Sequence, residues 1–242
     1  MRDFEDGTIN VVGDRGYSFC NCRNIFFTDW KNIDLTIYDE NYMESEGGDS
    51  GDKRVRELEV SKQWQIVQRF VPKAKSLLNI GDYEDTFLDY LKKQDWNNMS
   101  LTTIDLVPRE SKYRLIQANF ESHEFGAEKF DIIWMSHFIE HTHSPKEALL
   151  KARGLLNPGG IIFNAMPDTH HIDWSNPLAW YWMVQEHHTL WNMYDWISFA
   201  KEECGLECLY GNISTDVVEL EGSSGKSNLY WINESRTIFK LP

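Results

Sequence analysis

The residues of this chain best suited to chemistry are a carboxylate, a glycine and two histidine-bearing segments. Asp105 ends a hydrophobic run at residues 101–105, where a carboxylate can accept hydrogen bonds from both hydroxyls of a ribose. Gly81 ends another such run, and glycine lets the backbone approach a ligand closely. Glu140-His141 and Glu186-His187-His188 carry imidazoles, and a histidine such as His187 is suited to taking a proton from a hydroxyl. The carboxylate and the glycine indicate a nucleoside pocket.

Alternating strands and helices are expected to position these residues. The hydrophobic runs predict strands at residues 77–81, 101–105, 113–117, 132–135, 161–165, 206–213 and 228–239. Helices are expected at residues 55–70, 86–93 and 192–204, and also after Ser144, where Ser144, Pro145 and Glu147 form a helix start. Gly205 is a stop signal for the helix at 192–204. This alternation predicts an α/β fold with parallel strands joined by crossover helices.

Residues 130–167 carry a distinctive sequence motif. Its positions are Phe130-Asp131-Ile132-Ile133, Glu140-His141, Pro145, Leu149, Leu155-Leu156, Pro158-Gly159-Gly160 and Pro167. The pattern resembles the class I S-adenosylmethionine-dependent methyltransferases, especially the bacterial branch that modifies small molecules and sugars. The resemblance implies a Rossmann-like fold with a seven-stranded, mostly parallel sheet flanked by helices. It also implies S-adenosylmethionine as the cofactor.

The first motif of that family, roughly D-x-G-x-G-x-G, is eroded in this chain. Asn79, Gly81, Tyr83 and Asp85 stand where the acidic residue and the three glycines would fall, so only the first glycine is present. A tyrosine at the second glycine position is expected to narrow the cleft. Tyr83 could stack on the ligand or fill the space of the ligand, and both alternatives stay open.

The resemblance implies cofactor contacts at Gly81, Tyr83, Asp105, Asn119 and His137. Gly81 would approach the methionine part, Asp105 the ribose and Asn119 the adenine amino group. His137 would lie at the lip where family members meet the transferred methyl group. The alternative for Asp105 is a helix cap or a solvated loop carboxylate, and the alternative for Asn119 is a turn residue.

The segment from Asp168 to Trp191 is expected to contain the acceptor-binding elements. Its Glu186-His187-His188 text resembles a family signature, and some sugar methyltransferases use a histidine of this region as general base. The resemblance therefore implies a catalytic role for His187. The alternative is that His187 and His188 bond to the backbone and fix the loop. The tryptophans of the segment could likewise form an acceptor pocket or plain core.

Composition excludes several classes of partner. The 242 residues carry a formal net charge of −14, which disfavours a nucleic-acid substrate because such binding draws its affinity from Lys and Arg. No apolar run approaches the ~20 residues that span a bilayer, and the acidic N-terminus is unlike a signal peptide. We therefore expect a cytoplasmic protein with no membrane partner. The four cysteines are interpreted as reduced thiols.

Two regions are expected along the chain. Residues 1–52 form an aromatic-rich N-terminal extension and a flexible connection, and residues 53–242 form the methyltransferase-like domain. Cys20-Asn21-Cys22 resembles the end of a zinc ribbon, but two thiols cannot supply the four ligands of structural zinc. The histidines at 137, 141, 187 and 188 are likewise interpreted without a metal. No metal site is expected.

The preferred function is transfer of a methyl group to an oxygen, or less readily a carbon or nitrogen, of a small polar acceptor such as a sugar or nucleotide sugar. The alternative is a catalytically degenerate methyltransferase fold that acts as a binding or scaffolding subunit, because Asn79, Tyr83 and Asp85 depart from the motif. An NAD-dependent oxidoreductase is disfavoured because it needs the missing glycines more strictly. A homo-oligomer or a protein partner stays open.

Overall fold

The computed structural model describes residues 18–20, 25–27, 36, 53–81, 84–94, 96, 98–170, 187–221 and 227–242. At 18–20, 25–27, 216–221 and 227–233 the description covers the backbone. Several predictions fall outside the described residues. These are the role of Tyr83, the flexible connection before residue 53, Cys22, the tryptophans at 174, 180 and 182, and Glu186.

The main sheet has seven strands in the order β5-β4-β3-β6-β7-β10-β9. Its five parallel strands are β3 (Ser76–Ile80), β4 (Ser100–Asp105), β5 (Arg114–Gln117), β6 (Phe130–Ser136) and β7 (Leu156–Pro167). The antiparallel strands β9 (Glu207–Glu221) and β10 (Ser227–Lys240) complete it, with β10 between β7 and β9. The predicted seven-stranded, mostly parallel sheet is therefore confirmed.

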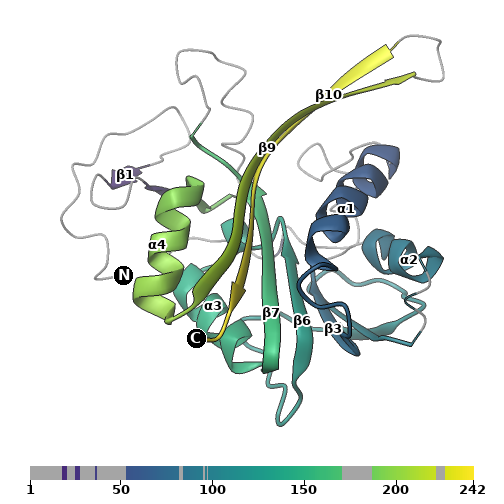
Figure 1. Cartoon of the computed structure of the whole chain (residues 1–242), viewed down its shortest axis with the longest axis vertical. Coiled ribbons are helices and arrows are strands. Elements are labelled where there is room, and N and C mark those ends of the chain that lie inside the picture. The colour runs from purple at the N-terminus through teal and green to yellow at the C-terminus, as the bar shows by residue number, and fades with distance from the viewer. Residues whose placement is uncertain are drawn as a thin grey trace.

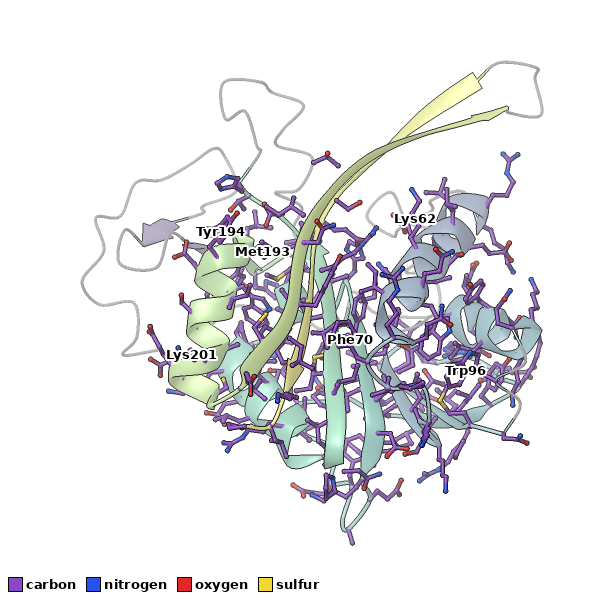
Figure 2. The ribbon with its side chains drawn as sticks, in the orientation of Figure 1. Lys62, Phe70, Trp96, Met193, Tyr194 and Lys201 are labelled. Carbon is purple, nitrogen blue, oxygen red and sulfur yellow. The ribbon has the colours of Figure 1, made fainter. Side chains whose placement is uncertain are left out.

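Helices cover both faces of the sheet (Figure 1). On one face lie α1 (Lys53–Val67) and α2 (Thr86–Lys93), and on the other lie α3 (Pro145–Gly154) and α4 (Met193–Cys204). Figure 2 shows this division through its labelled side chains, with Trp96 near α2 and Met193 and Tyr194 on α4. The described elements thus form three layers, helices over sheet over helices.

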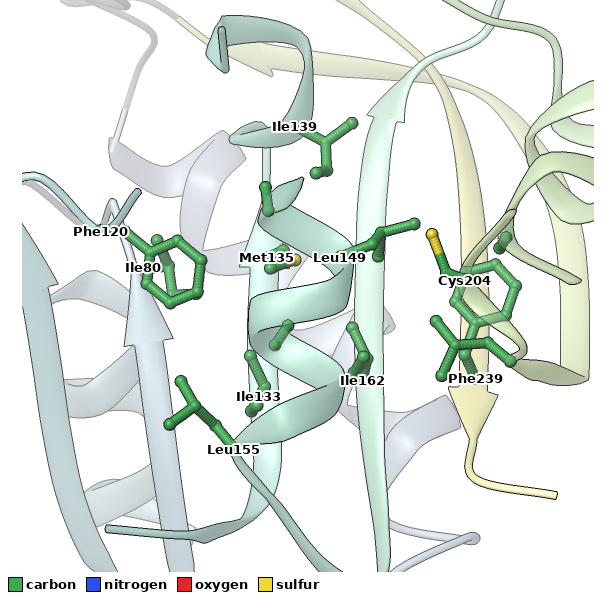
Figure 3. Close-up of a cluster of buried hydrophobic side chains, with 14 of the residues drawn as sticks. Ile80, Phe120, Ile133, Met135, Ile139, Leu149, Leu155, Ile162, Cys204 and Phe239 are labelled. Carbon is green, nitrogen blue, oxygen red and sulfur yellow. The ribbon is translucent and has the colours of Figure 1, made fainter. Parts of the chain in front are cut away.

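Two apolar clusters hold these layers together. One joins α3 and α4 to the sheet through residues such as Leu149, Phe199 and Phe239, each 3% exposed or less. Figure 3 shows Leu149, Cys204 and Phe239 packed over Ile133 and Ile162. The other joins α1 and α2 to the opposite face and is rich in rings, such as Trp64, Phe87 and Trp134. Both clusters remove large apolar side chains from water, which is the main stabilising term of a fold.

Two predicted helix boundaries are confirmed by their caps. The Ser144 hydroxyl accepts a hydrogen bond from the Glu147 amide at 3.3 Å, and Pro145 is the first helical residue of α3. The Asn192 side chain accepts a hydrogen bond from the Asp195 amide at 3.0 Å, and α4 ends at Gly205 with a φ of 60°. Such caps satisfy amides that a helix leaves unpaired at its first turn. The sequence signals therefore act where they were read.

Other boundaries differ from the prediction. Helix α1 begins and ends earlier than the expected 55–70, and residues 68–70 continue it as a turn. Strand β7 is longer than 161–165 because the Pro158-Gly159-Gly160 segment also lies in it. A Cβ at Gly160 would lie 3.0 Å from the carbonyl oxygens of Phe130 and Asp131, so glycine avoids a tight contact with the backbone of β6.

Strands β9 and β10 are longer than the sheet that they complete. Only the part of β10 from Glu234 to Lys240 pairs with β7, whereas its pairing with β9 continues to Ser227. The rest of β10, from Ser227 to Asn233, and the part of β9 paired with it project beyond the other strands as a two-stranded ribbon (Figure 1). Glu234 therefore stands where β10 leaves the edge of β7, opposite Pro167.

A second sheet connects the start of the chain to a late segment. Strands β1 (Ser18–Cys20), β2 (Ile25–Phe27) and β8 (Thr189–Leu190) pair antiparallel in that order. Phe27 of β2 lies opposite Thr189 of β8. The pairing fixes part of the N-terminal extension next to the segment that carries His187.

Among the described residues, no helix is both long and apolar enough to span a bilayer.

Candidate active site

Four of the predicted site residues gather at one edge of the main sheet. Gly81 follows β3, Asp105 ends β4, Asn119 follows β5 and His137 follows β6. Backbone hydrogen bonds join neighbouring strand ends, from Gly81 to Ile104 at 3.0 Å and from Ala118 to Asp105 at 3.0 Å. The carboxyl ends of parallel strands share one edge, and ligands of open α/β sheets bind there. The sequence-derived grouping is therefore present in the fold.

Gly81 has the backbone conformation that favours glycine. Its φ is 77°, in the left-handed region. A Cβ built there would meet only the Phe138 ring, at 3.8 Å, which is ordinary van der Waals contact. The backbone conformation therefore favours glycine at this turn, whereas the described neighbours would leave room for a Cβ.

Asp105 has one bonded and one unbonded carboxylate oxygen. The residue is 7% exposed, and Oδ1 accepts a hydrogen bond from the Val107 amide at 2.9 Å. Oδ2 is buried and has no hydrogen bond within the described part of the chain, although Arg109 Nε lies 3.7 Å away. Burial raises the pKa of Asp105, against the opposing effects of the Val107 amide and Arg109. Oδ2 is thus a buried acceptor that lacks a donor.

Asp85, which was predicted to stand at the third glycine position, has a left-handed backbone conformation. Its φ is 55°, and Asp is one of the few residues that tolerates the left-handed region. Its carboxylate accepts hydrogen bonds from Arg109 Nη1 at 2.6 Å and from the Ser111 hydroxyl at 2.7 Å. We call Asp85, Asp105 and Arg109 the Arg109 cluster. The Asp85 carboxylate is therefore paired with Arg109, a cation from the loop after β4.

Asn119 makes the contacts of a turn residue. Its Oδ1 accepts a hydrogen bond from the Glu121 amide at 2.7 Å, and its carbonyl accepts one from the His123 amide at 2.9 Å. Phe120 beside it is 3% exposed and packs in the core. These contacts fit the turn alternative, and they fix Asn119 at the strand edge where the adenine role was predicted. That role stays a prediction.

His137 lies between two buried carboxylates. Its Nδ1 lies 3.3 Å from Glu140 Oε1 and its Nε2 lies 3.1 Å from Glu234 Oε2, and both carboxylates are 1% exposed. Burial acts to lower the pKa of His137, but its interactions with the Glu140 and Glu234 carboxylates raise that pKa well above its ordinary value. The two carboxylates thus favour the protonated imidazole. The backbone of His137 has a φ of 51°, in the left-handed region.

Further polar side chains complete this arrangement on the Glu234 side. The Gln63 amide donates to both oxygens of Glu234 at 3.0 and 3.1 Å, and Arg236 Nε also donates to Glu234. The Ser136 hydroxyl donates to Gln63 Oε1 at 3.3 Å. We call His137, Glu140, Glu234, Arg236 and Gln63 the His137 cluster. The sequence reasoning missed Gln63, Glu234 and Arg236, because no motif marks them and only the pairing of β10 with β7 brings Glu234 to this edge.

His187 lies next to this cluster. It is 8% exposed, and its ring packs edge-on against His141 with centroids 4.8 Å apart. The neighbouring His188 amide donates to the Glu140 carbonyl at 2.7 Å, which joins the two segments through their backbones. The two histidine-bearing segments of the sequence therefore meet in the fold.

Three groups around His187 have shifted pKa values, namely His141, His188 and Glu140. Burial and the neighbouring His187 lower the pKa of His141 to about 3. Burial acts to raise the pKa of Glu140, but His137 and the nearby histidines outweigh burial and lower this pKa from 4.5 to about 2. Burial together with His143 and His187 lowers the pKa of His188 to about 4. Near neutral pH the site offers uncharged imidazoles at 141 and 188 and a charged Glu140.

A family model described as a methyltransferase domain matches residues 54–209. No curated protein sequence is detectably similar to the chain. Among solved structures, the plantazolicin methyltransferase BpumL in complex with S-adenosylhomocysteine has a TM-score of 0.60 at 14% identity, over 88% of this chain and 93% of that one.

Two further structures show the same fold. The N-methyltransferase NodS from Bradyrhizobium japonicum, also bound to S-adenosylhomocysteine, has a TM-score of 0.50 at 14% identity, over 75% of this chain and 86% of that one. A complex of the Haloferax volcanii Trm112 methyltransferase activator with a protein described as a methyltransferase gives 0.55 at 13% identity, over 77% and 94%. These likenesses confirm the predicted Rossmann-like fold.

Proposed function

Because the chain belongs to the methyltransferase domain family, we propose that it transfers the methyl group of S-adenosylmethionine to an oxygen of a small polar acceptor, such as a sugar or nucleotide sugar. The observation that carries the proposal is Asp105 Oδ2, a buried acceptor without a donor among the described residues, at the end of β4. Buried polar atoms normally have partners. A ribose hydroxyl is the donor that fits this position in the fold.

The described residues fit the cofactor. Gly81 and Asp105 lie at the ends of adjacent strands, as a nucleoside pocket of this fold requires. Arg109 balances part of the negative charge at this edge, because its guanidinium contacts both Asp85 and Asp105. Asn119 and His137 follow β5 and β6 on the same edge, and we propose them as contacts to the adenine and to the methyl-bearing side. Tyr83, outside the described residues, is proposed as a further contact.

When bound, S-adenosylmethionine supplies an electrophilic methyl group on a sulfonium centre. The protein then has to hold the acceptor in line and assist loss of its proton. We propose His187 as the residue that activates the acceptor, because it lies beside the ionised Glu140 at the end of β6. The His137 cluster holds Glu140 in place from the other side.

Calorimetric titration with S-adenosylhomocysteine tests the cofactor site. Asp105→Asn keeps the size of the side chain but removes the charge that strengthens hydrogen bonds to the ribose, and we expect affinity to fall about 100-fold. Asp89→Asn is the matched control, because Asp89 lies on α2 and bonds to Lys112 and Tyr113. Equal affinities of wild type and Asp105→Asn, or no binding by the wild type at millimolar ligand, would overturn the proposal.

A further inference from the structure

One carboxylate and two imidazoles converge where the segment after β6 meets the segment before β8. Glu140 and His141 belong to the short 3-10 helix η5 (Ile139–His141), and His187 comes from the chain that enters β8. One potential ligand atom from each residue lies within 4.8 Å of the others. Glu140 Oε1 and His141 Nε2 are 4.0 Å apart. Residues distant in the sequence thus form a compact donor set.

The Glu140 carboxylate gives an independent indication of a ligand. Its side chain is 1% exposed, and neither oxygen has a hydrogen bond within the described residues. Its ion pair with His137 leaves Oε2 without a close donor in that part of the chain. A buried charge that lacks hydrogen bonds is costly, so a carboxylate in this state usually faces a cation or another missing partner.

We propose that Glu140, His141 and His187 bind a divalent transition-metal ion of the Zn²⁺ type. Two imidazoles and a carboxylate are a donor set that such ions accept, whereas Mg²⁺ and Ca²⁺ prefer oxygen ligands. Tetrahedral coordination with bonds of about 2.0–2.2 Å brings ligand atoms to about 3.4 Å from one another. Small side-chain rotations therefore close the present spacing of up to 4.8 Å around an ion.

The role of the ion rests on the proposed function. Three protein ligands leave a coordination position open, and an oxygen of the acceptor can occupy it. A bound ion would lower the pKa of an acceptor hydroxyl, whose proton would pass to water as the methyl group moves, and His187 would hold the ion instead of taking the proton. His137 contacts Glu140 from the opposite side and orients the carboxylate, as outer-shell partners of metal sites do.

The test uses the full chain, stripped of metal with a chelator and titrated with Co²⁺. We expect about one Co²⁺ per chain with visible absorption bands of a site with nitrogen ligands. Glu140→Gln and His187→Gln should each weaken Co²⁺ binding at least about tenfold. His143→Gln is the matched control, because His143 is a nearby, more exposed histidine that pairs with Glu121. Thermal unfolding of each variant shows whether it is folded.

A second measurement needs no variant. X-ray absorption of the Zn²⁺-loaded wild type should show two imidazole ligands per ion. Absence of Co²⁺ binding in the wild type, equal binding by Glu140→Gln and His143→Gln, or an imidazole count other than two would overturn the metal site. S-adenosylhomocysteine titration of the metal-free protein separates the proposals, because binding there supports the cofactor site even when the metal site fails.

Discussion

The Arg109 cluster and the His137 cluster solve the same electrostatic problem with chain segments of different origin. Each places two carboxylates at the carboxyl edge of the sheet and pairs them with basic side chains. The Arg109 cluster comes from two consecutive loops, after β3 and β4. The His137 cluster joins α1, the segment after β6 and strand β10. The first is local and the second depends on the assembled sheet.

This difference teaches where each cluster is vulnerable. The Arg109 cluster depends on short connections that form with their own strands. Glu234 reaches His137 only because β10 inserts between β7 and β9 in the observed register. A shift of that register by one residue would turn Glu234 to the other face of the sheet. The His137 cluster therefore reports on the completed fold, and the Arg109 cluster on the proposed cofactor site.

The largest expected effect comes from Glu234→Ala. Loss of this carboxylate leaves buried Arg236 and half-buried His137 without their shared partner, and breaking the buried ion pair of Arg236 with Glu234 costs about 3–5 kcal/mol. Chemical denaturation measures the free energy of unfolding. Glu207→Ala is the matched control, because Glu207 pairs with Lys240 on the same two strands but is solvent-exposed, where a pair contributes about 0–1 kcal/mol. Similar losses for both variants would contradict the buried role of Glu234.

A smaller effect is expected from pH on the cofactor site. Burial raises the pKa of Asp105, and the nearby Asp85 adds to this, while the Val107 amide and Arg109 oppose it. Hydrogen bonds to a ribose favour the ionised carboxylate, so affinity for S-adenosylhomocysteine is full above that pKa and falls as pH drops through it. The decline should begin at higher pH than the ordinary value of 3.8 predicts. Calorimetry over a pH series measures it.

The control for this pH dependence is Asp105→Asn, which cannot titrate. Its weaker affinity should not show the same decline. A wild-type affinity that stays constant down to the ordinary range of an aspartate, or a variant with an unchanged pH profile, would assign the dependence to another group. Either result would weaken the contrast between the two clusters, because Asp105 would no longer be the titrating group of the cofactor site.

The smallest effect is expected from Gly81→Ala. The φ of 77° is a left-handed conformation, which costs a residue with Cβ about 1–2 kcal/mol, and Phe138 leaves room for the methyl group. Gly126→Ala is the control, since Gly126 has a φ of 60° and open space around its Cα but lies away from the site. Both variants should lose similar stability in thermal unfolding, and only Gly81→Ala should weaken S-adenosylhomocysteine binding. Equal binding by both would remove Gly81 from the site.

The sequence predicted the local features well. The positions of Gly81, Asp105 and His137 at strand ends follow from hydrophobic runs and turn residues, the helix start at Ser144 follows from a capping pattern, and the end of α4 follows from Gly205. Such signals depend on neighbours in the chain, so they can be read without the fold. The lengths of β7, β9 and β10 were underestimated, because pairing with distant strands extends them beyond their hydrophobic runs.

The missed residues share a physical reason. Glu234 lies in a strand whose text gives no sign of a buried carboxylate, and Arg109 follows β4 without a motif. Their roles depend on partners far away in the sequence, such as Gln63 for Glu234 and Asp85 for Arg109. The expectation of no metal site was drawn from each histidine segment separately. The fold brings Glu140, His141 and His187 together.

The small sheet that joins β2 to β8 has a consequence for the order in which the protein matures. Phe27 is synthesised early, but its partner Thr189 follows all five parallel strands. Contacts between such distant segments form late, because the closure of long loops has to be offset by structure already in place. The pairing of β2 with β8 beside His187 therefore forms only after the five parallel strands have been made.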